Sequence, residues 1–258
     1  MRAAPGRTSG AVAAVLAVCA MAGCAGSPDA PDPVPASPAP DALVLRRHLS
    51  GGIGGIGLHG SVPDLSVYGD GRVIAVREDG ARHEPLPRLQ EYRLTPRALR
   101  RLIDDAFAAG LAEPRRVRRE NVADAFTLTV RFGSAVTTIE HPGDDDPAVR
   151  FAERRLAPER WPRQDLAAPP GPYRVERLAA LFHPQADDPG NVRRWPFTPP
   201  GTQERPCLVL QGRDAARALR IAEDTDGRTA WGDGGRAYTV RWRPLLPGED
   251  GCADVTGP

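Results

Sequence analysis

The stretch that most constrains the fold runs from residue 65 to residue 111, where a short hairpin precedes a well-delimited helix. Two β-rich runs, residues 65–68 and 72–76, flank the turn sequence Gly69-Asp70-Gly71. Both glycines can adopt positive φ around an aspartate that favours turns. The stretch therefore predicts a tight β-hairpin.

The helix after this hairpin has a start, a face and an end that can be identified from sequence. Thr95 can serve as its N-cap, with Pro96 at the first helical position. Leu94 can form a hydrophobic staple with Leu99, and Gly110-Leu111 is typical of a helix that ends at a glycine in the left-handed conformation. Neither hairpin nor helix is stable alone, so each must bury its apolar side against the other. The apolar stripe at helical spacing consists of Leu99, Leu102, Ile103, Ala106 and Phe107.

Lysine is absent from the chain, so all 34 positions counted as Lys or Arg are arginine. This excludes a P-loop lysine, a Schiff-base lysine and a Ser-x-x-Lys nucleophile. The formal net charge is +1, and removal of Arg2 and Arg7 with a cleaved leader would make it slightly negative. We therefore expect no nucleic-acid partner.

Residues 1–23 have the features of a secretory leader, with arginines before an apolar run, Ala11–Ala22, that is too short to span a bilayer. Met21-Ala22-Gly23-Cys24 resembles the bacterial lipobox, in which a small residue precedes a cysteine that receives a diacylglyceryl group. We therefore expect Cys24 to be lipidated and to anchor the chain at the outer face of the cytoplasmic membrane. Secretion without an anchor is the alternative, because Ala20-Met21-Ala22 also fits a small-x-small cleavage site.

The cysteine count favours lipidation over secretion without an anchor. Cys19 leaves with the leader, and Cys207 and Cys252 are the two cysteines of the region expected to fold. We expect these two to form a disulfide, because only one pairing exists there. An unmodified Cys24 would then be an odd, exposed thiol in an oxidising compartment.

After the leader, the sequence predicts a tether and two folded regions. Residues 24–41 are rich in Ala, Pro, Ser and Asp without periodicity, which predicts a disordered linker. We expect an N-terminal α+β region over residues 42–168 and a C-terminal α+β region over residues 169–258. The boundary is placed at Pro169-Pro170-Gly171-Pro172.

A helix followed by a hairpin is expected in both regions, over residues 95–140 and 214–242. In the first, residues 126–132 and 135–140 form the hairpin; in the second, Asp214 caps the helix and residues 231–242 form the hairpin. This pattern predicts an α+β fold of antiparallel sheets built from hairpins, with helices packed on one face and two similar subdomains.

Several short motifs accompany the lipobox: Tyr68-Gly-Asp-Gly-Arg-Val-Ile74, Ala109-Gly-Leu111, Arg194-Trp-Pro196, Cys207, Tyr238, Arg243-Pro-Leu-Leu-Pro247 and Cys252. Together they resemble a family of uncharacterised actinobacterial secreted lipoproteins. The resemblance covers nearly the whole mature chain. It implies a location and an architecture, and it implies no activity.

Motifs for common catalytic chemistry are absent from the sequence. There is no nucleophile elbow, no His-Glu-x-x-His zinc motif and no paired Cys-x-x-Cys, and the five histidines have no partner at ligand spacing. Gly52, Gly54 and Gly57 match a dinucleotide-binding spacing, but the helix that this motif requires cannot follow them. We therefore expect no metal and no cofactor. Dispersed carboxylates leave no motif, so a cell-envelope hydrolase is the alternative function.

We favour a non-catalytic role in which the tethered domain binds an envelope polymer or protein through an exposed aromatic or arginine patch. Trp161, Trp195 and Trp231 stand beside Pro or Gly, where loops are expected, so they are candidates for a binding surface. The competing interpretation is that the three rings cap the edges of the core.

Four arginines are clustered within residues 115–119, and this cluster has two interpretations. It could contact anionic lipid or a wall polymer, or it could be part of a solvated loop.

Overall fold

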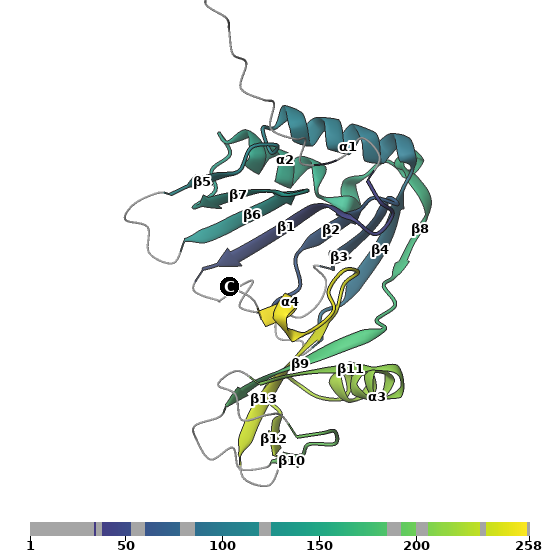
Figure 1. Cartoon of the computed structure of the whole chain (residues 1–258), viewed down its shortest axis with the longest axis vertical. Helices are drawn as coiled ribbons and strands as arrows, with labels where there is room; N and C mark the ends of the chain where they lie inside the picture. The colour runs from purple at the N-terminus through teal and green to yellow at the C-terminus, as the bar shows by residue number, and fades with distance from the viewer. Residues whose placement is uncertain are drawn as a thin grey trace, which may run out of the picture. The chain divides into compact units, whose positions relative to one another are not determined.

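The fold is of the α+β class, as the sequence predicts. The computed structural model describes residue 34 and residues 38–52, 60–77, 86–118, 125–184, 192–199, 206–232 and 236–256. Within these residues the chain forms one eight-stranded sheet, one five-stranded sheet and four α-helices (Figure 1). All of them belong to one compact unit that spans Asp32–Pro258.

The first sheet has the strand order β5-β7-β6-β1-β2-β3-β4-β8. Its neighbouring strands are antiparallel except for β5 and β7, which are parallel. The strands are β1 (Leu43–Gly51), β2 (Leu65–Tyr68), β3 (Arg72–Val76), β4 (Leu89–Leu94), β5 (Arg115–Val117), β6 (Phe126–Phe132), β7 (Ala135–Glu140) and β8 (Leu166–Pro172).

Two helices, α1 (Pro96–Ala108) and α2 (Pro147–Arg155), cover one face of this sheet (Figure 1). Short 3-10 turns, Pro158–Arg160 and Arg163–Asp165, lead from α2 to β8. Alternate residues of β6, among them Val130 and Phe132, share a core with Leu102 and Ala106 of α1. The period of two along the strand and the 3.6-residue period of the helix therefore meet on one buried face.

The ends of α1 confirm the expected capping. The Thr95 hydroxyl accepts a hydrogen bond from the Ala98 amide at 3.2 Å, and Pro96 opens the helix. Gly110 has a φ of +73°, and the Leu111 amide returns to the Ala106 carbonyl at 3.1 Å. These bonds satisfy groups that a helix end otherwise leaves unpaired.

The two glycines of the first turn have different roles, which corrects the expectation that both can use positive φ. Gly71 has a φ of +80°, whereas Gly69 is required by close packing, because a Cβ there would lie 2.1 Å from the Ala39 carbonyl oxygen. The chain before β1 is thus part of the packed structure. Val34 is also buried in the core of the first sheet, so described residues of the expected linker, 24–41, take part in the packing.

The second sheet has the order β10-β12-β13-β9-β11. Its strands pair antiparallel except for β10 with β12. α3 packs on one face around Trp242 and Phe182, and Val255 of the short α4 packs with Leu181 on the other. The elements are β9 (Arg177–Pro184), β10 (Arg193–Arg194), β11 (Cys207–Gln211), α3 (Gly212–Glu223), β12 (Ala230–Gly232), β13 (Ala237–Pro244) and α4 (Cys252–Thr256).

Two expectations about local boundaries need adjustment. The proline-rich segment is edge strand β8 of the first sheet, and the chain passes to the second sheet between Pro172 and Arg177, beyond the expected boundary at residue 168. Proline is tolerated there because one side of an edge strand needs no amide donors. Asp214 lies in the first turn of α3, and Gln211 occupies the N-cap without a side-chain hydrogen bond.

Candidate functional site

The first sheet presents a group of polar side chains on the face opposite α1 and α2. Leu45 and Phe132 pair across β1 and β6 and point into the core, so the residues next to them point away from the helices. Strand β6 pairs with β1 on one side and with β7 on the other. Among the outward residues in these pairings, all are polar except Val136. We call this set the polar face: Arg46, His48, Ser50, Thr127, Thr129, Arg131, Thr138 and Glu140.

Two arginines lie directly opposite each other on the polar face. Arg46 of β1 pairs in register with Arg131 of β6, and opposed residues on one face have Cβ atoms about 4.5–5.5 Å apart. Like charges in this arrangement destabilise a sheet. Arg46 is partly neutralised, because its guanidinium lies 3.4 Å from Glu249 and donates to the Ser66 hydroxyl at 3.2 Å. Arg131 is exposed, and among the described residues it makes no ion pair or hydrogen bond.

Hydroxyl groups follow the two arginines along the strands of the polar face. Thr129 of β6 lies between Thr138 of β7 and His48 of β1, and Thr127 lies between Glu140 and Ser50. These side chains are half-buried. Because neighbouring strands are about 4.8 Å apart, the hydroxyls form two adjacent rows of groups that both donate and accept hydrogen bonds.

The carboxylate of the polar face is already neutralised. Glu140 lies 3.0 Å from the Arg116 guanidinium and 3.7 Å from that of Arg118. Arg115, on the other side of β5, pairs with Asp146 at 2.5 Å. The described arginines of the 115–119 run therefore border a sheet edge and are paired with acidic groups, while Arg119 lies outside the described residues.

A buried ion pair lies beside the polar face. The side chains of Glu249 and Arg243 are only 5% and 3% exposed, and their charged atoms are 2.9 Å apart. Glu249 also accepts a hydrogen bond from the Leu246 amide at 2.8 Å, and Arg243 donates to the Pro244 carbonyl. These bonds satisfy a carboxylate that would be costly to bury unpaired.

Two tyrosines complete the polar cluster around this ion pair. Burial raises the pKa of Tyr173 to about 12, and its hydroxyl donates to the Leu245 carbonyl at 3.1 Å. Burial also raises the pKa of Tyr68, and the nearby Arg46 guanidinium opposes that rise. Leu246 packs against the Tyr68 side of the first sheet. The segment after β13 is thereby held by both polar and apolar contacts.

An open groove of about 560 Å³ lies between residues 174–177 and the start of α3. Its charged lining is mixed, with Arg174, Glu176 and Arg177. Arg177 is occupied, because it donates to the Glu249 carbonyl at 2.7 Å and lies 3.4 Å from Asp250. The groove therefore has no concentration of one charge that would define a ligand.

The three tryptophans singled out by sequence do not form a joint exposed surface. Trp195 and Trp231 are 6% and 5% exposed, and their rings meet edge to face in the core of the second sheet. Trp195 also stacks on Trp242 with centroids 5.7 Å apart, because large aromatic faces bury most area when they pack on one another. This corrects the interpretation of the two rings as a binding surface in favour of core residues.

Trp161 lies in the first sheet's region, away from that aromatic cluster, and is half-buried. Its indole donates to the Arg155 carbonyl at 2.8 Å, and its ring contacts Tyr92 edge to face with centroids 6.0 Å apart. It therefore caps the edge of the helix-covered core.

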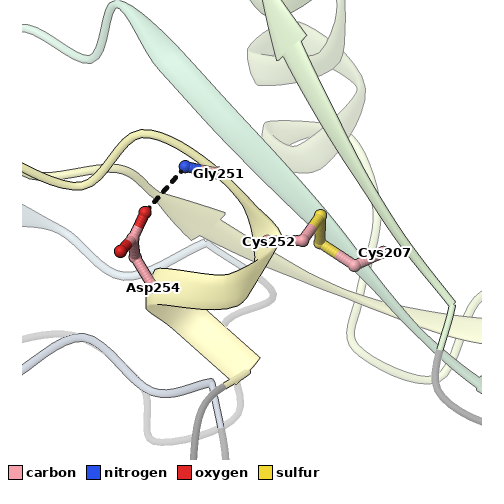
Figure 2. The surroundings of a disulfide bond; sticks show 4 residues. All are labelled: Cys207, Gly251, Cys252 and Asp254. Atoms are coloured by element: carbon pink, nitrogen blue, oxygen red, sulfur yellow. Dashed lines mark hydrogen bonds between the residues drawn. A yellow bond between two sulfur atoms is a disulfide. The ribbon is translucent and has the colours of Figure 1, made fainter.

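Cys207 and Cys252 form the expected disulfide. The sulfur atoms are 2.02 Å apart and join the first residue of β11 to the first residue of α4 (Figure 2). Asp254 accepts hydrogen bonds from the amides of Asp250 and Gly251, which lowers the pKa of its carboxyl group. The lipidation candidate, Cys24, lies outside the described residues.

Thr127, Thr129 and Arg131 can be recognised in the sequence only as the polar positions of an alternating strand. Their clustering with Arg46 depends on the β1–β6 register, which joins residues about 85 apart in the chain and leaves no local signal. Glu249 was missed for the same reason.

The polar face thus has the chemistry of a binding surface, with cations and hydroxyls and without a free acid.

Within the described part of the chain, no group of three or more His, Cys, Asp or Glu side chains could hold a metal ion. No helix among the described residues is long and apolar enough to cross a membrane. Comparison of the chain with protein-family models, curated proteins and solved structures found no match.

Proposed function

We propose that this chain is a lipid-anchored extracytoplasmic protein that binds a component of the cell envelope without catalysing a reaction. The observation that carries the proposed location is the Cys207–Cys252 disulfide. Disulfides persist in oxidising compartments and are rare in the cytosol of most organisms. A disulfide in a chain that begins with a leader-like segment supports export.

Attachment at Cys24 completes this proposal. Because Cys207 and Cys252 pair with each other, Cys24 is the cysteine left over after removal of the expected leader. A diacylglyceryl group supplies two acyl chains, which hold a protein on a membrane where one chain gives marginal binding. The resemblance to actinobacterial secreted lipoproteins agrees with this assignment, and secretion without an anchor is its alternative.

A binding role is favoured over hydrolysis by the state of the carboxylates near the polar face. A glycoside hydrolase needs one carboxyl group that donates a proton and a second that acts as base or nucleophile. Glu140 and Glu249 instead each pair with two arginines. Both carboxylates are therefore already engaged by guanidinium groups of this chain and not presented to a bound sugar.

The anchor is tested by fractionating cells that express the full chain with Cys24→Ala. We expect the variant to leave the membrane fraction or to accumulate as an unprocessed precursor. Met21→Leu is the matched control, since leucine is usual at that lipobox position, and this variant should remain mature and membrane-bound. Mature, membrane-bound Cys24→Ala protein would contradict lipidation at Cys24.

A further inference from the structure

We infer that the polar face binds an acidic polysaccharide, a polymer that carries carboxylate groups among many hydroxyls. This inference deepens the proposed function, because it names the envelope component and the surface that receives it. The surface consists of the outward residues of β1, β6 and β7, centred on Arg131.

The charge of this surface favours an acidic ligand. The outward positions of β1, β6, β7 and the adjoining β5 include Arg46, Arg131 and Arg116, against the single carboxylate Glu140. Arg118 also faces Glu140, and Glu249 approaches Arg46 from the segment after β13. Glu140 and Glu249 are each shared between two arginines. The excess of positive charge is therefore centred on Arg131 and on Arg46, which lies opposite it.

The opposed arginines give a reason for a ligand at this point. Arg46 and Arg131 stand in register, where their repulsion costs the sheet stability. A carboxylate placed between them would remove that repulsion and accept charge-assisted hydrogen bonds from either guanidinium. Arg46 already has one carboxylate beside it, because an oxygen of Glu249 lies 3.4 Å from its guanidinium. The equivalent position beside Arg131 has no carboxylate from the described residues.

The hydroxyl rows explain why the ligand is a polysaccharide and not a membrane surface. Thr127, Thr129, Thr138 and Ser50 can donate to and accept from sugar hydroxyls, and they continue away from the arginines along two adjacent rows. Membrane binding by a surface is strengthened by apolar side chains that enter the lipid, in addition to attraction between cations and anionic headgroups. Among the described residues, the large hydrophobic side chains that are exposed are Phe126 and Val192, and neither belongs to the polar face.

Binding is measured with the full chain purified in detergent, on sensor surfaces that carry polygalacturonate or neutral dextran. We expect saturable binding to polygalacturonate that weakens as salt rises, and none to dextran. Arg131→Gln should weaken binding about tenfold or more, as expected for the loss of one charge-assisted hydrogen bond. Arg100→Gln is the matched control, because it removes the same charge from an exposed position on α1. It should leave binding unchanged.

A second measurement separates binding from folding. Arg131→Gln removes one of two opposed like charges, so it should leave the thermal midpoint unchanged or raise it. Lower binding together with an unchanged or higher midpoint supports the inference. A lower midpoint, equal losses for Arg131→Gln and Arg100→Gln, or equal binding to dextran would overturn it.

Two further outcomes distinguish this inference from the proposed function. Absence of binding to polygalacturonate by a chain that still fractionates with the membrane through Cys24 would overturn the polysaccharide and leave the anchor intact. Binding that depends on Arg131 but occurs only on vesicles with anionic phospholipid would also overturn it, in favour of contact with the membrane surface.

Discussion

The buried ion pair between Arg243 and Glu249 leads to a quantitative prediction. The two side chains are 3% and 5% exposed, and the carboxylate also accepts a hydrogen bond from the Leu246 amide at 2.8 Å. Glu249→Gln removes the negative charge and leaves Arg243 buried without a counter-charge. Breaking a buried pair in this way costs about 3–5 kcal/mol. Since glutamine keeps one acceptor oxygen, we expect a loss of about 3 kcal/mol in the free energy of unfolding.

Glu140→Gln provides the matched control. Its ion pair with Arg116 is of similar length, 3.0 Å, but the two side chains are 29% and 58% exposed. Exposed pairs contribute about 0–1 kcal/mol, so this variant should be close to the wild type. Chemical denaturation followed by the fluorescence of the buried tryptophans measures both variants.

A double variant tests whether the cost comes from the unpaired charge. Replacing a buried ion pair by apolar residues of similar volume is often neutral, so Arg243→Met with Glu249→Leu should lose less stability than Glu249→Gln alone. If Glu249→Gln costs no more than Glu140→Gln, the burial argument is refuted. If the double variant is less stable than Glu249→Gln, the unpaired charge is not the cause of the loss.

The disulfide, the buried face of α1 and the Tyr173 hydroxyl can each be tested by one substitution. Cys207→Ser should lower the free energy of unfolding by about 4 kcal/mol on the chain-entropy model, because the bridge spans a separation of 45 residues. The bridge itself is checked by alkylating the unreduced wild type and measuring its intact mass. Two alkylated cysteines, beyond any at Cys24, would contradict it. Leu102→Ala should lower the free energy of unfolding by about 2–5 kcal/mol, because Leu102 is only 4% exposed. Arg100→Ala, on the exposed side of α1, should have little effect. Equal losses of stability on chemical denaturation would show that the buried face of the helix is misassigned. The pKa of Tyr173 is raised from 10.0 to about 12, so its stabilising contribution is complete below pH 10 and is lost as the pH rises through 12. Tyr173→Phe should show a smaller fall in stability between pH 10 and pH 12, and an identical fall in both proteins would contradict this assignment.

Much of the fold follows from local sequence. The turn at Gly69-Asp70-Gly71, the Thr95 cap and the stop at Gly110 depend on the backbone preferences of a few neighbouring residues, and all three occur where the sequence predicts them. Alternation along residues 126–140 likewise specifies a hairpin with one buried face, because a register slip would expose every apolar side chain. The disulfide could be assigned by elimination, since two cysteines allow one pairing.

Local preferences do not select which distant segments share a face. The aromatic rings of Trp195 and Trp231 appear in loop-like sequence, yet they are buried because other elements of the second sheet supply a core around them. Val34 lies in a proline-rich stretch that resembles a linker, but it is buried in the core of the first sheet.

The polar face is the clearest case of this dependence. Alternation along residues 126–132 is enough to identify Arg131 and its alternate neighbours as the outward positions of a strand. Only the pairing of β1 with β6 placed Arg46 opposite Arg131, and only the return of the chain after β13 placed Glu249 beside Arg46. Local preferences act over a few residues, whereas side chains that meet across a sheet are chosen by how the buried faces of the whole chain fit together.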